Sequence, residues 1–212
     1  YSFTVSNFLY KSAISSTSSA SLFFLRCFFN SVNVAFFGIF KEVVGAKKIA
    51  FLWEDLEWTH LWRTGIPGKL PTWSEYAKQL YGLETVYDAG FKARTGMYLP
   101  VLEGIQKSGA DVVFMVSSWV TDTEVFAKQW AESSAKDVQP CFYGGTSHTY
   151  DFWEMTGGKC LGAMGSFYEK ELPVPPGGAE WLQMCDSKGI PVQINVGIGY
   201  ADTYLIKKVI EV

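Results

Sequence analysis

The sequence predicts an α/β protein built on a doubly wound parallel sheet, and three observations support this prediction. Residues 112–116 (VVFMV) form an unbroken apolar run, which is typical of a strand buried on both faces between layers of helices. Strand and helix patterns alternate from residue 47 to about residue 165, as they do when crossover helices join parallel strands. Hydrophobic residues make up 48% of the 212 residues and charged residues 18%, which is enough apolar material for such a core.

Short apolar stretches bounded by turn residues mark the strands. We expect strands over 47–53, 83–87, 111–116, 138–143 and 161–164. Helical spacing of apolar residues, closed in several cases by glycine, marks the helices. We expect helices over 73–81, 97–107, from 121 onward, and over 150–155, 179–187 and 200–210. Glu54, Asp55 and Trp58 are expected in a polar turn after the first strand.

The most apolar stretch of the chain, residues 21–40, requires a choice between a membrane span and a buried helix. Its apolar residues follow steps of three and four, which places them on one face of a helix. Arg26, Asn30 and Asn33 fall together on another face. We therefore predict an amphipathic helix that packs against a core rather than a helix that crosses a membrane.

Composition and cysteine spacing exclude several classes of partner. The formal net charge is −3 and the sequence pI is about 5.5, so there is no basic surface for nucleic acid. The four cysteines form no CxxC pair and have no zinc-like spacing to histidine, so we expect no metal and no cofactor. Cys141 and Cys160 fall in two neighbouring predicted strands, and the sequence leaves open whether they form a disulfide or stay free thiols.

Polar and aromatic residues follow three of the expected strands at their carboxyl ends, the edge at which open α/β sheets bind ligands. These residues are Trp58, Ser117, Ser118, Trp119, Thr146 and Ser147. A tryptophan offers a large contact area with few torsions to freeze, and a hydroxyl donates or accepts as a ligand requires. We therefore predict a ligand site here. Each residue also has a local interpretation, as a packing ring or as a turn or N-cap hydroxyl.

Candidates for catalysis are few. Cys141 and His148 are residue types that serve as nucleophile and base, but Cys141 lies within an apolar strand, where a thiolate is disfavoured. Glu54 and Asp55 follow the first strand, and we interpret them as a solvated turn. The sequence has no Walker glycine–lysine motif and no GxGxxG motif that opens a helix. We expect no catalytic residue and no enzyme activity.

Four segments, taken together, resemble the type I periplasmic binding fold, in particular the branched-chain amino-acid and amide substrate-binding proteins of ABC transporters. They are GAKKIAFLWEDLEW (45–58), KSGADVVFMVSSW (107–119), CFYGGTS (141–147) and GYADTYLI (199–206). In this family two α/β lobes close on a ligand. The resemblance implies that residues 46–166 form a complete second lobe. Residues 1–45, with the amphipathic helix, and 167–212 would then be partial segments of the first lobe, whose opening strands have no counterpart here. We expect these end segments to need another sheet for burial.

The resemblance also implies a function, that of an extracytoplasmic solute-binding protein in the periplasm or on the cell surface that passes a small-molecule ligand to an ABC permease. By position, Trp58 matches an aromatic that covers the ligand, and residues 117–119 match a loop that supplies an aromatic wall and a hydroxyl. Amino-acid binders of the family tend to carry an acidic residue where this sequence has Thr146 and Ser147. The ligand class therefore stays open between an amino acid, an amide and a related polar solute. A ligand-sensing receptor or regulator of the same fold and an α/β enzyme are the alternatives, and a membrane anchor on the full-length protein stays open.

Overall fold

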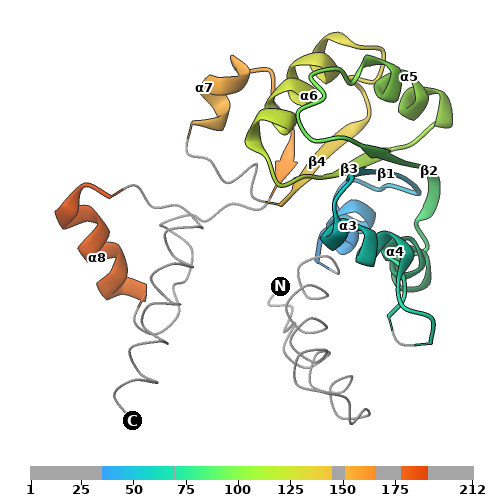
Figure 1. Cartoon of the computed structure of the whole chain (residues 1–212), viewed down its shortest axis with the longest axis horizontal. Coiled ribbons are helices and arrows are strands. Elements are labelled where there is room, and N and C mark those ends of the chain that lie inside the picture. The colour runs from blue at the N-terminus through green and yellow to red at the C-terminus, as the bar shows by residue number, and fades with distance from the viewer. Residues whose placement is uncertain (1–34, 69, 145–150, 166–177, 191–212) are drawn as a thin grey trace.

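A computed structural model describes residues 35–68, 70–144, 151–165 and 178–190 (Figure 1). Its centre is a sheet of five parallel strands in the order β2-β1-β3-β4-β5. The strands are β1 (Lys48–Glu54), β2 (Glu84–Phe91), β3 (Val112–Val116), β4 (Gln139–Tyr143) and β5 (Met164–Gly165). This confirms the predicted doubly wound parallel sheet.

The strand order reverses between β1 and β3, and this reversal distributes the helices over both faces of the sheet. A right-handed crossover from β1 to β2 puts its helices on one face, and crossovers in the opposite direction put theirs on the other. Figure 1 shows α3 and α4 on one side of the sheet and α5 and α6 on the other. The helices are α3 (Glu57–Thr64), α4 (Trp73–Tyr81), α5 (Leu99–Ser108), α6 (Val120–Glu132), α7 (Phe152–Thr156) and α8 (Gly178–Lys188).

Each face of the sheet has its own hydrophobic core, because successive strand residues point to opposite faces. Phe51 and Phe114 pack on the α3/α4 side with Trp62 and Trp73. The other core lies under α5, α6 and α7 and is formed by apolar residues of alternate strand positions and these helices, including Leu52, Val113, Met115, Leu102, Phe126 and Phe152. Both faces of the central strands are therefore buried, as the continuous apolar run of β3 predicts.

Of the helix predicted over 21–40, residues 21–34 lie outside the described residues, and the described part is helical from residue 35 to residue 42. There it packs on the α3/α4 face. The Phe36 ring lies 5.4 Å from that of Phe114 and 6.1 Å from that of Tyr143, and Phe37 and Phe40 are fully buried. Residues 35–42 thus bury their apolar side on this sheet. This corrects the expectation that the segment before residue 46 needs a second sheet for burial. No helix among the described residues is long and apolar enough to span a bilayer.

The expected strands are all present, with two corrections of length. β2 extends to Phe91, beyond the predicted 83–87, and β5 is limited to Met164–Gly165, later than the predicted 161–164. Among the helices, α4 matches its predicted bounds because Thr72 and Glu75 form a reciprocal capping box and Gly82 ends the helix with a positive φ. The helix predicted over 200–210 lies outside the described residues.

Helix α3 was missed, and the prediction of a polar turn at Trp58 was wrong. Its N-cap residue is Leu56, which carries none of the usual capping groups. The Thr59 hydroxyl instead joins the start of the helix to the end of β1, because it accepts from the Leu56 N–H at 3.4 Å and donates toward the carbonyls of Glu54 and Leu56. The structure also decides the question of Cys141 and Cys160, since both are free cysteines.

Candidate functional site

The carboxyl ends of β1 and β3 lie next to each other where the strand order reverses, which is the place where open α/β sheets bind ligands. Glu54 ends β1, and Ser117, Ser118 and Trp119 connect β3 to α6. Trp58 lies in the first turn of α3. The structure thus brings four of the predicted site residues to one edge of the sheet.

Trp58 and Ser118 are in direct contact. The Trp58 indole N–H donates a hydrogen bond of 3.1 Å to the Ser118 hydroxyl. Trp58 also lines an open, mainly apolar hollow together with Leu56, Glu57 and Leu61. The tryptophan therefore joins α3 to the loop after β3 and presents apolar surface beside it.

Glu54 is fully buried, which corrects the expectation of a solvated turn at this acid. One carboxylate oxygen accepts a hydrogen bond of 2.5 Å from the Ser118 backbone N–H. The other oxygen is buried and has no hydrogen-bond partner among the described residues. Glu54 therefore holds the backbone of the β3–α6 loop, and the sequence signal it carried was its place at the end of an apolar run.

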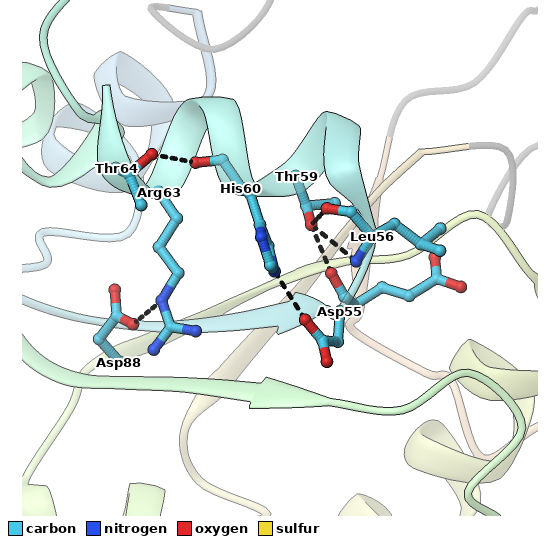
Figure 2. Close-up of polar contacts among 8 residues, drawn as sticks. Asp55, Leu56, Thr59, His60, Arg63, Thr64 and Asp88 are labelled. Atoms are coloured by element: carbon cyan, nitrogen blue, oxygen red, sulfur yellow. Dashed lines mark hydrogen bonds and ion pairs between the residues drawn. The ribbon is translucent and has the colours of Figure 1, made fainter. Parts of the chain in front are cut away.

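Asp55, the neighbour of Glu54, is exposed and lies just before α3, where it pairs with a residue of that helix. Figure 2 shows its carboxylate facing the imidazole of His60, at 2.6 Å, while Arg63 farther along α3 reaches Asp88 of β2 at 2.6 Å. These pairs connect α3 to the residue before its start and to the edge strand β2. The Asp55–His60 pair is exposed and contributes little to stability, whereas Arg63 and Asp88 are partly buried.

Ser117 has no exposed surface, and it contacts both its own loop and the end of β4. Its hydroxyl lies 3.3 Å from the backbone N of Trp119, and its own N–H donates to the Tyr143 carbonyl at 2.9 Å. A Cβ on Gly144 would lie 1.9 Å from the Ser117 carbonyl oxygen, so only glycine fits there. Ser117 and Gly144 together fix the direction in which the β3–α6 loop leaves the sheet.

Trp119 is the exposed aromatic of the site, with 44% of its surface accessible. The Arg94 guanidinium, from the loop between β2 and α5, lies over the Trp119 ring at 4.5 Å from its centroid. This stacking is a cation–π contact. Nothing in the sequence pattern indicated that Arg94 would reach this edge.

Asp122, in the first turn of α6, holds the loop that carries Arg94 through hydrogen bonds to its backbone. It is buried, and its two oxygens accept from the Arg94 backbone N–H at 2.8 and 2.9 Å. The Tyr98 hydroxyl donates to the same carboxylate at 2.8 Å. Burial, and then the bond to Asp122, raise the pKa of Tyr98 well above its usual value, so this hydroxyl stays a donor. The available signal was an acid in helical register with the buried Phe126 and Trp130.

The structure describes only some of the remaining candidate residues. Thr146, Ser147 and His148 lie outside the described residues. Cys141 is buried in β4, and burial raises the pKa of its thiol well above the usual range, as expected for a core thiol. The described ranges contain no group of three or more side chains that could hold a metal ion.

Comparison by sequence finds no match, either among protein-family models or among curated proteins. Solved structures do match. An ABC transporter substrate-binding protein from Sphaerobacter thermophilus is 19% identical over 75% of this chain and 42% of its own, with a TM-score of 0.59. A leucine-binding protein from Thermotoga maritima is 11% identical over 74% and 42%, with a TM-score of 0.56. A branched-chain amino acid transporter substrate-binding protein from Streptococcus pneumoniae, solved with isoleucine, is 13% identical over 74% and 42%, with a TM-score of 0.52.

The chain spans about two fifths of the length of these proteins. Identities this low carry information about the fold and not about the ligand. Together with the parallel five-stranded sheet and its helices on both faces, the matches identify this chain as having the type I periplasmic binding fold.

Proposed function

We propose that the protein is the extracytoplasmic solute-binding component of an ABC importer, located in the periplasm or at the cell surface. It would bind a small polar ligand, such as an amino acid, an amide or a related solute, and present it to a permease. It would carry out no chemistry of its own. The support comes from the fold, because the similar solved structures are themselves described as transporter substrate-binding proteins.

In this proposal residues 46–166 form one lobe, with the helix at 35–42 packed on its sheet. Residues 1–34 and 167–212 would contribute segments to the other lobe. A ligand between two lobes favours the closed state only through contacts that it makes to both at once. The strand-end edge would be this lobe's wall of the cleft.

The observation that carries the proposal is the exposed Trp119 at the switch point of the sheet, on a loop fixed from three sides. Glu54 holds the Ser118 N–H, Trp58 holds the Ser118 hydroxyl, and Gly144 abuts Ser117. A rigid aromatic on an immobilised loop is suited to binding because little conformational freedom is lost when a ligand arrives.

We assign roles to the site residues on this basis. Trp58, Ser118 and Trp119 would contact the ligand, whereas Ser117, which is fully buried, would shape the loop. Thr146 and Ser147 follow β4 and would extend the same edge.

The test is ligand binding to the full-length protein, titrated with amino acids, short carboxylates and amides and followed by tryptophan fluorescence and calorimetry. Trp119→Ala should weaken binding by about 1 kcal/mol or more, as expected for an aromatic anchor. Trp153→Ala is the matched control, because Trp153 is 52% exposed on α7 and should leave affinity unchanged. Failure of every solute to bind would refute the function. Binding that is insensitive to Trp119→Ala would refute only the site.

A further inference from the structure

We propose that Arg94, stacked on Trp119, binds a carboxylate group of the ligand, so that the solute is a carboxylate-bearing one. The inference rests on the proposed function and deepens it. It concerns which chemical group this wall of the cleft recognises.

The backbone at Arg94 is held in a conformation that its side chain does not favour. Arg94 is the only non-glycine residue with a positive φ, +59°, in the described ranges. Such a conformation persists only when the surroundings impose it, and it is concentrated at functional sites. Here the two Asp122 oxygens impose it by accepting the Arg94 N–H.

The rest of the loop is attached to α6 as well. The Gln129 side chain accepts from the Tyr98 N–H at 2.7 Å and donates to the Gly96 carbonyl at 3.0 Å. Together with the Tyr98–Asp122 bond, these contacts set the position from which Arg94 extends. The loop backbone is therefore fixed by the protein itself, and the stack on Trp119 positions the guanidinium.

No described side chain neutralises the charge of the Arg94 guanidinium. Within the part of the chain that the structure describes, no carboxylate lies at ion-pair distance from its guanidinium. The carboxylate oxygens of Asp122 accept hydrogen bonds from the Arg94 backbone N–H and from the Tyr98 hydroxyl. Arg94 is exposed, so its charge would be available to a ligand at this edge of the sheet.

The geometry of the stack favours a carboxylate. The Trp119 ring covers one face of the guanidinium, which leaves the N–H groups at its rim to donate. A planar carboxylate matches two of these donors side by side. A single guanidinium also suits a singly charged group better than a phosphate, which usually gathers several donors.

The experiment compares paired probes on the full-length protein. Amino acids and short aliphatic carboxylates are titrated beside their own amides, which keep the shape and lose the charge, and inorganic phosphate is titrated separately. Arg94→Gln should weaken carboxylate binding about 10- to 100-fold and leave amide binding within about twofold of the wild type. Lys92→Gln removes the same charge two residues earlier in the loop and should change neither.

A second variant separates recognition from folding. Arg94→Gly relieves the positive φ and should raise the unfolding midpoint, yet it should lose carboxylate affinity as Arg94→Gln does. Equal effects of Arg94→Gln on carboxylates and amides, or none on either, would overturn the inference while the proposed function stands. Phosphate binding in preference to carboxylates would overturn the ligand class. If no solute binds the wild type, the proposed function fails, and the inference fails with it.

Discussion

The Trp58 indole N–H donates to the Ser118 hydroxyl at 3.1 Å, across 60 residues of sequence. Through this bond the first turn of α3 supports the loop that carries Trp119. Because Glu54 holds the backbone N–H of the same serine, Ser118 is fixed at two points. The loop that we propose as a binding surface is thus positioned by Glu54, the last residue of β1, and by Trp58 of α3.

The Trp58–Ser118 bond should contribute measurably to stability. We expect Trp58→Phe and Ser118→Ala each to lower the free energy of unfolding by about 1 kcal/mol. The double variant should lose less stability than the two single variants do together, because each change removes the same hydrogen bond. Urea unfolding of the four proteins measures the coupling. Strictly additive losses would show that the bond contributes nothing.

Gly144 should not tolerate even one methyl group. A Cβ there would meet the Ser117 carbonyl oxygen at 1.9 Å, and φ is +116°. We expect Gly144→Ala to cost about 3 kcal/mol or more, from overpacking and from the unfavourable backbone together. Gly157→Ala is the control, because Gly157 has φ +61° with nothing within 4 Å of the added Cβ, and it should cost only about 1 kcal/mol. Thermal unfolding compares the two, and equal losses would contradict the close approach.

Asp122 should be needed as a carboxylate and not only as a polar side chain. It accepts from Arg94 and Tyr98, and an asparagine would turn an N–H₂ group toward these donors. We expect Asp122→Asn to cost about 2 kcal/mol, in the range for hydrogen bonds to a charged group. Asp137→Asn, at an exposed acid, should stay within about 0.5 kcal/mol of the wild type. A similar effect of both changes on chemical denaturation would refute the role given to Asp122.

Alkaline pH should destabilise the protein partly through Tyr143. Burial raises the pKa of Tyr143 to about 12, whereas an unfolded tyrosine titrates near pH 10. Between these values the unfolded chain loses a proton that the folded chain keeps, so stability is complete below about pH 10 and falls as pH rises.

The measurement for Tyr143 is the free energy of unfolding at several pH values between about 9 and 11.5. Its decline should be shallower in Tyr143→Phe than in the wild type, by up to about 1.4 kcal/mol per pH unit. Parallel pH profiles in the two proteins would show that the hydroxyl is not protected by burial.

The arrangement of the sheet was predictable because its signals are local. The apolar run of β3 reports burial on both faces, and α4 carries its own start and stop in Thr72, Glu75 and Gly82. Once strands and helices alternate, the right-handed crossover restricts which face each helix covers. Helix α3 escaped prediction because its start depends on Thr59 binding the backbone of Glu54 and Leu56, with no capping residue in the usual place.

The candidate site was predictable only as a set of loops. The sequence alone determined that Trp58, Ser118 and Trp119 follow parallel strands and so share an edge. Only the tertiary structure decided that Glu54 is buried and that Arg94 stacks on Trp119. Asp122 fixes the loop that carries Arg94. The physical reason is that periodicity records which face of an element is apolar. Contacts between side chains far apart in the sequence depend on how the loops meet once the sheet has formed.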